Sequence, residues 1–262
     1  ILRFPQRYLL KALKLYFVKD HTDKGDISPF SSLMVALAAN IGAGNIIGVG
    51  VAIAAGGPGA VFWCWLTGVL GMATRYSEGL LAIKYRVENK DGNMSGGPMF
   101  VLERGLNSKW LGTAFAVFTA IAAFGIGNLT QGNAAAEQLH HAFSIPSWGT
   151  AAVLTALTAL VMLGGIQGIA RVCAFFVPFM AVIYIMGCLY ILTVQAEYII
   201  PAIRYILDCA FTGEAAAGGA AGAAVMAAMR TGVARGLFSN EAGLGSAAIA
   251  SAAAQNRNPV RQ

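Results

Sequence analysis

The sequence is poor in charged residues: Asp, Glu, Lys and Arg make up 11% of its 262 residues, against about 25% in an ordinary soluble domain. Cysteines are also few, since four are present and no two have the CxxC spacing, so neither a disulfide framework nor a cysteine-based zinc site is indicated. Long polar stretches are scarce, and several runs of 18 or more mostly apolar residues take their place, which is typical of membrane-spanning helices. These shortages exclude an ordinary soluble core and indicate a polytopic, all-α membrane protein that lies in a lipid bilayer.

The charges that are present lie unevenly along the chain, which has a net charge of +6. Residues 1–26 carry six Lys or Arg residues between apolar ones, which predicts a basic amphipathic helix on the cytoplasmic membrane surface. A nucleic-acid-binding arm is disfavoured so close to a membrane span. When the predicted spans alternate, 13 of the 18 Lys and Arg residues fall on one side of the membrane. The positive-inside rule therefore places the N-terminus in the cytoplasm.

The apolar runs predict five helices in residues 27–196 and a sixth in residues 197–262, which also hold an extracellular amphipathic segment and a cytoplasmic tail. The 86–110 loop and a short connection at Gln167–Arg171 are the polar links on the cytoplasmic side. Pro178 is expected to kink the fifth helix, because proline removes a backbone donor. The six expected spans are roughly 29–55, 60–85, 111–140, 149–166, 172–196 and 215–238.

The first span contains an unusual stretch, residues 39–62, which reads ANIGAGNIIGVGVAIAAGGPGAVF. Seven glycines and two amides, Asn40 and Asn45, lie in this apolar run, and each glycine lowers helix propensity by ~1 kcal/mol relative to alanine. A helix broken at membrane depth leaves backbone N–H and C=O groups that need a partner, and in a transporter that partner can be a substrate or an ion. Close helix packing through small residues is the alternative. A nucleotide-binding glycine loop is disfavoured, because no strand precedes GAGNIIG.

Glycine or other small residues also accompany polar groups in the third span, around Gly125–Asn133, and in the sixth, around Gly218–Gly222. The first and sixth spans are five helices apart, which is the spacing that a five-plus-five inverted repeat would give. In such transporters, half-helix N-termini point at anionic groups and free carbonyls bind cations. The pattern therefore suits a small zwitterion, with N–H groups for its carboxylate and carbonyls for Na⁺ and its ammonium group.

Several long motifs carry a family resemblance. NIGAGNIIGVGVAIAAGGPG, GNMSGGPMFVLERGL, GNLTQGN and ARGLFSNEAGLGSAAIASAAA resemble the alanine or glycine:cation symporter family (sodium:alanine symporters). The resemblance implies Na⁺- or H⁺-coupled uptake of alanine, glycine or similar amino acids across a bacterial or archaeal inner membrane. It also implies a LeuT-like inverted-repeat fold. The family pattern continues for several more helices, so the chain resembles the N-terminal part: the first five-helix repeat and the first helix of the second.

The resemblance also implies site residues. The backbone at the break in the first helix, near Ala43 and Gly44, would hold the substrate carboxylate. The sequence departs from the family at Ala220, where a bulky aromatic residue is common, so either the pocket is wider or another residue closes it. The implied substrate-binding residues are Ala43, Gly44, Asn45, Gln131, Gly219, Ala220 and Ala223. The implied Na⁺ ligands are the backbone carbonyls of Ala39, Asn40 and Gly42.

These observations predict a secondary active symporter with no enzymatic activity and no cofactor besides the coupling ion; the oligomeric state is left open. An ion channel or pore subunit and an H⁺-coupled carrier are the alternatives. A membrane-embedded enzyme would need clustered His, Asp or Ser at depth, and the close pair His140–His141 stands at an interface. Arg75 and Glu78 fall on one helix face and are expected to pair. Three charged residues of the sixth region are expected either to form an inner gate with Glu78 or Arg75, or to pack and extend toward the membrane surface; they are Arg230, Arg235 and Glu241.

Overall fold

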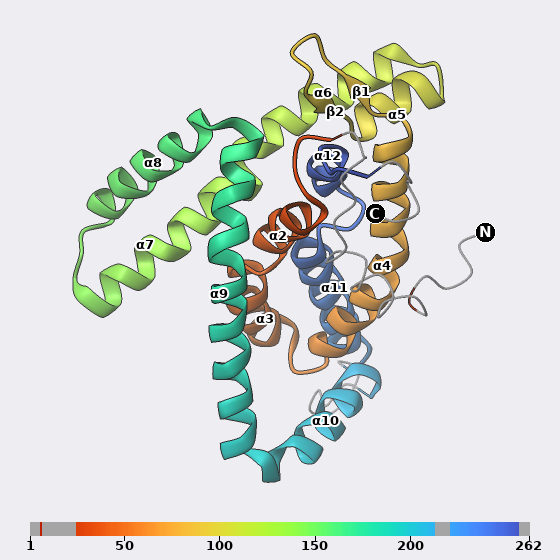
Figure 1. Ribbon diagram of the computed structural model, residues 1–262. Coiled ribbons are helices and arrows are strands. Elements are labelled where there is room, and N and C mark those ends of the chain that lie inside the picture. The colour runs from red at the N-terminus through yellow and green to blue at the C-terminus, as the bar shows by residue number, and fades with distance from the viewer. Residues whose placement is uncertain (1–5, 7–24, 213–220, 257–262) are drawn as a thin grey trace. The chain divides into compact units, whose positions relative to one another are not determined.

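The computed structural model describes residues 6, 25–212 and 221–256, with backbone only at 126–128 and 221–223. The predicted amphipathic helix at 1–26 therefore lies almost wholly outside the described residues. The described part is mostly helical and carries a single two-stranded β-hairpin (Figure 1). In chain order the elements are α2 Pro29–Asn40, α3 Ala43–Gly56, α4 Ala60–Lys84, β1 Val87–Glu88, β2 Met94–Ser95, α5 Pro98–Gly105, α6 Lys109–Ala123, the π-helix η2 Phe124–Leu129, α7 Thr130–Phe143, α8 Ser147–Leu163, α9 Gly165–Val194, α10 Ala196–Phe211, α11 Ala221–Asn240 and α12 Ser246–Ala252.

The first predicted span is broken where the sequence indicates. Helix α2 ends at Asn40, Gly42 adopts an extended conformation (φ −146°, ψ −163°), and α3 begins at Ala43. The last carbonyls of a helix have no intrahelical partner, and here the Asn45 Nδ2 donates a hydrogen bond to the Asn40 carbonyl across the break. The predicted interruption between Asn40 and Asn45 is confirmed, and the Asn45 side chain bridges it.

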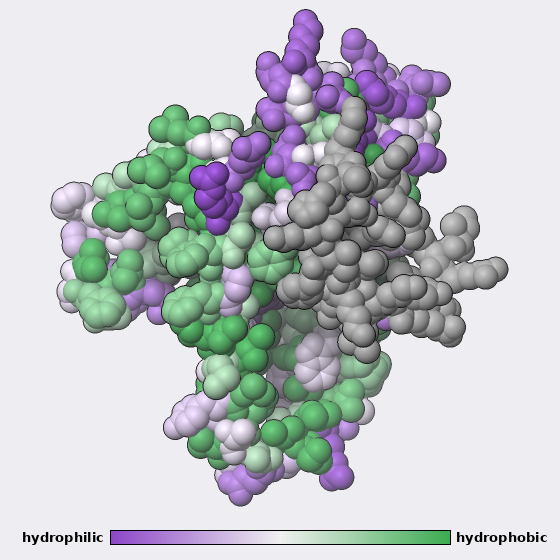
Figure 2. Space-filling view, in the orientation of Figure 1, coloured by the Kyte–Doolittle hydropathy of each residue, from purple (hydrophilic) through white to green (hydrophobic). Residues whose placement is uncertain are grey.

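Two helical stretches among the described residues are long and apolar enough to cross a membrane: Pro29–Gly56, counted across its break, and Gly165–Val194. Helices α6 and α8 are apolar but shorter. Large apolar side chains stand exposed on these helices, for example Phe175 at 73% and Leu163 at 90%, and Figure 2 shows hydrophobic side chains over the visible faces of α8 and α9. Exposed apolar area on this scale is expected for surfaces that face lipid or another protein.

The predicted connection at Gln167–Arg171 is wrong, because these residues belong to α9. The turn between α8 and α9 lies at Gly164 and Gly165 instead. Gly165 has a φ of +59°, a left-handed conformation that glycine adopts at little cost. Helix α9 then continues through Pro178 without ending.

The described residues form two compact units. One contains 40–75, 177–212 and 221–244; the other contains 25–39, 76–176 and 245–256. In the first unit α11 packs antiparallel to α3, since Gly44 lies against Phe238 while Gly56 lies against Thr231. Small residues permit this close approach of helix backbones.

Helix α11 also packs tightly against α4 in this unit. The Cys64 Sγ donates a hydrogen bond to the Gly232 carbonyl at 3.1 Å. A Cβ atom on Gly232 would lie 2.7 Å from Trp63 Cβ, and one on Gly236 would lie 3.3 Å from Cys64 Cα. Gly232 and Gly236 are four residues apart and therefore share one helix face, so glycine is needed at both positions for this contact.

In the second unit the tail after α12 is held to two earlier segments. The Arg86 guanidinium donates to the carbonyls of Ala252 (3.1 Å), Ala254 (2.7 Å) and Asn256 (2.8 Å). Ile27 pairs with Ala254 in a parallel β-bridge, and the β1–β2 hairpin is tied to the same region, because Asp26 accepts a hydrogen bond from the Met94 amide at 2.8 Å. These three segments, 25–28, 86–95 and 252–256, are called the tail clasp below.

In the same unit the third predicted span contains the π-helix η2, which overlaps the glycine- and amide-rich segment. The predicted 86–110 loop contains the hairpin and α5. Hydrophilic side chains gather over the hairpin in Figure 2. Glu78 accepts a hydrogen bond from the Gly245 amide at 3.2 Å, and its pairing with Arg75 stays a prediction.

Candidate functional site

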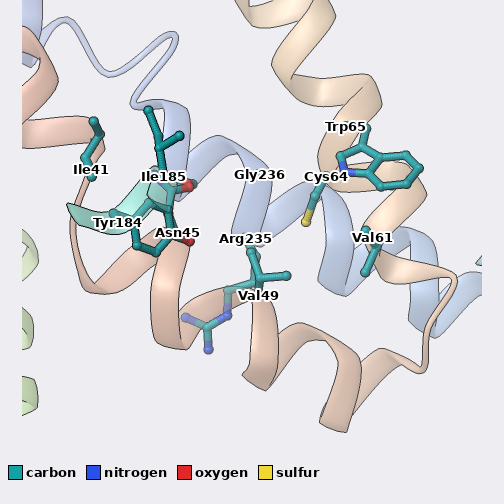
Figure 3. Close-up of a pocket in the computed structure, with 11 residues that line it drawn as sticks. Ile41, Asn45, Val49, Val61, Cys64, Trp65, Tyr184, Ile185, Arg235 and Gly236 are labelled. Carbon is teal, nitrogen blue, oxygen red and sulfur yellow. The ribbon is translucent and has the colours of Figure 1, made fainter. Parts of the chain in front are cut away.

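A cavity of 440 Å³ lies within the first unit, next to the break in the first span. Sites for small organic ligands commonly have volumes of ~300–1,000 Å³. Four helices line it, namely α3, α4, α9 and α11, together with Ile41 from the break itself (Figure 3). The lining residues are Ile41, Asn45, Val49, Val61, Cys64, Trp65, Tyr184, Ile185, Arg235, Gly236 and Ser239.

The polar wall of the cavity is formed where α3 meets α11. Asn45 and Val49 are one turn apart on α3, and Ser239 and Arg235 are one turn apart on α11, so each pair shares a helix face. The Ser239 hydroxyl donates a hydrogen bond to Asn45 Oδ1. Because the helices are antiparallel, the register that joins Asn45 to Ser239 brings Val49 to the level of Arg235, and Figure 3 shows Arg235 beside Val49.

The remaining wall is mainly apolar and comes from α4 and α9. Val61, Cys64 and Trp65 lie on α4, while Tyr184 and Ile185 lie on α9. The Cys64 thiol is already engaged with the Gly232 carbonyl. Arg235 is the only charged residue among those that line the cavity. The cavity thus combines an apolar surface with one amide, two hydroxyl groups and one positive charge.

The predicted residues at the break lie at this cavity or beside it. Asn45 lines the cavity directly. Gly44 is in the first turn of α3, and a Cβ there would lie 3.3 Å from the Phe238 ring. The N–H groups of a first helical turn point away from the helix, and the N-cap Gly42 forms no side-chain cap. The amides of Asn45 and Ile46 already donate to the Gly42 carbonyl, so the Gly44 amide is the donor considered for a ligand beside the cavity.

Of the other predicted substrate-binding residues, only Ala223 can be placed relative to the Asn45–Ser239 contact, and it lies far from it. Ala223 precedes Ser239 by 16 residues of continuous helix, a separation of roughly 24 Å at 1.5 Å per residue. Gln131 lies exposed on α7 in the second unit, whose position relative to the cavity is not described. Gly219 and Ala220 lie outside the described residues.

Two of the three carbonyls predicted to bind Na⁺ already accept hydrogen bonds in this conformation. The Asn40 carbonyl accepts from the Gly42 amide at 3.2 Å and from the Asn45 side chain. The Gly42 carbonyl accepts from the amides of Asn45 (3.0 Å) and Ile46 (3.2 Å). A carbonyl oxygen has two lone pairs, so an ion bound at either of these two atoms would have to displace a donor. Ala39, the third predicted ligand, is exposed at the end of α2.

Sequence reasoning did not identify most of the cavity wall. Val61, Trp65, Tyr184 and Ile185 belong to apolar runs in which cavity-facing and lipid-facing residues look alike. Ser239 belongs to the glycine-rich motif ARGLFSNEAG, and a polar side chain near the end of an apolar helix could have indicated a binding site there. Arg235, in the same motif, was considered for a gate or for extension to the membrane surface, and the structure places it in the cavity wall.

A broken apolar helix beside a small, largely apolar cavity with few polar groups is typical of membrane transporters. The sequence matches the sodium:alanine symporter family over residues 1–262. The chain belongs to this family and is therefore an integral membrane protein, and the predicted family resemblance is confirmed. The family consists of symporters, in agreement with the prediction of a transporter.

Individual relatives are similar along nearly the whole chain. A Haemophilus influenzae protein described as an uncharacterized transporter is 53% identical over 257 residues, covering 98% of this chain and 56% of the relative. The sodium/alanine symporter AgcS of Methanococcus maripaludis is 52% identical over 257 residues, covering 96% and 56%. The probable sodium/glutamine symporter GlnT of Bacillus subtilis is 38% identical over 239 residues, covering 91% and 49%. The chain thus spans about half the length of the curated relatives that it matches.

Proposed function

We propose that the full-length protein is a secondary active symporter that takes up small neutral amino acids together with Na⁺ by alternating access. The observation that carries this proposal is the break in the first span, because it opens beside a cavity lined by Asn45. A continuous helix would have its backbone groups satisfied within the span. A broken one presents donors and acceptors to a ligand at that depth.

The chemistry of the break suits an amino acid zwitterion. The N-terminus of α3 carries the positive end of the helix dipole, so a carboxylate is stabilised near the Gly44 amide. The side-chain oxygens of Asn45 and Ser239 offer acceptors for the ammonium group. The rest of the cavity wall is apolar, which favours an uncharged side chain.

The cavity volume supports a range of small substrates. Alanine has six non-hydrogen atoms, and even if each took the roughly 30 Å³ of a water molecule in the liquid, they would fill at most about 180 Å³, well under the 440 Å³ present. Among the relatives, one is described as a sodium/alanine symporter and another as a probable sodium/glutamine symporter. Both observations favour neutral amino acids from alanine to glutamine size.

The proposal includes features implied by the family resemblance. They are a LeuT-like fold of two inverted repeats, Na⁺ bound near Ala39–Gly42, and Gln131, Gly219, Ala220 and Ala223 as further substrate contacts. They also include a location in a prokaryotic inner membrane with a cytoplasmic N-terminus. Labelling a cysteine placed at Lys90 from each side of the membrane tests the orientation, and modification only from outside the cell would refute it.

Uptake by the full-length protein in liposomes tests the function. With an inward Na⁺ gradient, we expect labelled alanine to accumulate above its external concentration, and replacing Na⁺ by choline at constant pH should abolish that accumulation. Alanine flux that only equilibrates would indicate a channel, and accumulation driven by a pH gradient without Na⁺ would indicate a proton symporter. Either result would overturn the proposal.

A further inference from the structure

Arg235 is an unusual residue in the wall of the cavity. It lies in α11, between small and apolar residues, and is only partly exposed. Among the described residues its guanidinium group has no hydrogen-bond or ion-pair partner, and no carboxylate lines the cavity. A positive charge removed from water is costly unless an anion compensates for it, and unpaired charges within membrane proteins are typically functional.

We propose that Arg235 binds the carboxylate of the transported amino acid and so determines that the substrate must be a carboxylate. This inference rests on the proposed function. A guanidinium group presents its donors in a planar fork that matches both oxygens of a carboxylate. The ligand would supply the negative charge that the described cavity lacks.

The register of α3 and α11 brings the elements of this site together. Arg235 is one turn from Ser239 on α11, and Ser239 contacts Asn45 in the first turn of α3. The long arginine side chain and the positive end of the α3 dipole thus act on the same cavity, and both favour an anion. The apolar residues of α4 and α9 remain for the substrate side chain, while Asn45 and Ser239 remain for its ammonium group.

Arg230 provides a matched control on the same helix. It lies five residues before Arg235, is exposed, and does not line the cavity. Replacing Arg230 by glutamine changes the charge of α11 by the same amount as replacing Arg235. Any effect of overall charge on membrane insertion or stability should therefore be similar in the two variants.

The test compares alanine with alaninamide, in which a neutral amide replaces the carboxylate. Both compounds compete with labelled alanine for the full-length protein reconstituted in liposomes. For Arg235→Gln we expect the affinity for alanine to fall by about 10- to 100-fold, as for loss of a charge-assisted hydrogen bond, while the affinity for alaninamide changes less than about threefold. Arg235→Lys should recover part of the alanine affinity, and Arg230→Gln should bind both compounds as the unmodified protein does.

The outcomes separate this inference from the function on which it rests. Equal losses of affinity for alanine and alaninamide would mean that Arg235 has a structural role or pairs with a protein carboxylate, and the inference would fail. Unchanged affinity for alanine in Arg235→Gln would overturn it as well. If the unmodified protein binds no neutral amino acid, the proposed function itself fails. Melting curves of the purified variants verify that each one is folded.

Discussion

Replacing Gly236 by alanine tests the close packing of α11 against α4 beside the cavity. The new methyl group would overlap the Thr67 hydroxyl and lie 3.0 Å from Thr67 Cβ and 3.3 Å from Cys64 Cα. Overpacking of this kind typically costs 1–3 kcal/mol, and the upper end applies where backbone atoms leave no room to adjust. Alanine in place of a helical glycine regains up to ~1 kcal/mol. We therefore expect a net loss of stability of about 2 kcal/mol.

Gly187→Ala is the control for this prediction, since a Cβ at that position on α9 meets no atom within 4 Å. That variant should be as stable as the unmodified protein or more so, because the propensity gain is not opposed. The measurement is the apparent melting temperature of the purified full-length protein in detergent, without substrate.

A second substitution makes the prediction more specific. Thr67→Ala removes the overlapping hydroxyl. On its own it should lower stability by about 1 kcal/mol, because the hydrogen bond from that hydroxyl to the Cys64 carbonyl is lost. Combined with Gly236→Ala it should destabilise less than the sum of the two single changes, since contacting residues couple by 0.5–3 kcal/mol. Equal melting temperatures for Gly236→Ala and Gly187→Ala would refute the reasoning.

Two further predictions concern single side chains. Asn45→Ala removes the hydrogen bonds that bridge the helix break and join it to Ser239. We expect a loss of stability of about 1–2 kcal/mol and a raised KM for alanine uptake. An unchanged melting temperature and KM would contradict the bridging role. Arg86→Lys should release residues 252–256, because an ammonium group cannot reproduce the fork that binds three carbonyls. Faster limited proteolysis of that segment is the expected readout, and protection equal to that of the unmodified protein would argue against the tail clasp.

Local signals in the sequence were sufficient to predict the helices and the break. Glycine and asparagine near residue 42 weaken the helix regardless of the rest of the molecule, and the boundaries of α4 follow from a long apolar run between two turn signals. The connection at Gln167–Arg171 was misjudged because polar side chains were taken to mark a loop. The left-handed conformation of Gly165 (φ +59°) makes that turn instead.

The cavity wall and the tail clasp depend on contacts between distant residues, which local patterns do not encode. Nothing in the sequence around Tyr184 distinguishes a residue that faces a cavity from one that faces lipid, because both are apolar in a membrane protein. Arg86 likewise binds backbone carbonyls, which carry no residue-specific signal. By contrast, Arg235 stood out as a charge in an apolar helix, and its role could be proposed once its neighbours were known.

The tail clasp has a consequence for the order in which this protein folds during its synthesis. Ala254 leaves the ribosome 168 residues after Arg86, which at 5–20 residues per second is an interval of roughly 8–34 s. Helices α2 to α4 are made before that interval and α5 to α11 are synthesised within it, while the strand pairing at Ile27 and the carbonyl partners of Arg86 do not yet exist. We expect the unit that contains α2 to reach protease resistance only after residue 256 has been added, and nascent chains stalled before and after that point would show whether it does.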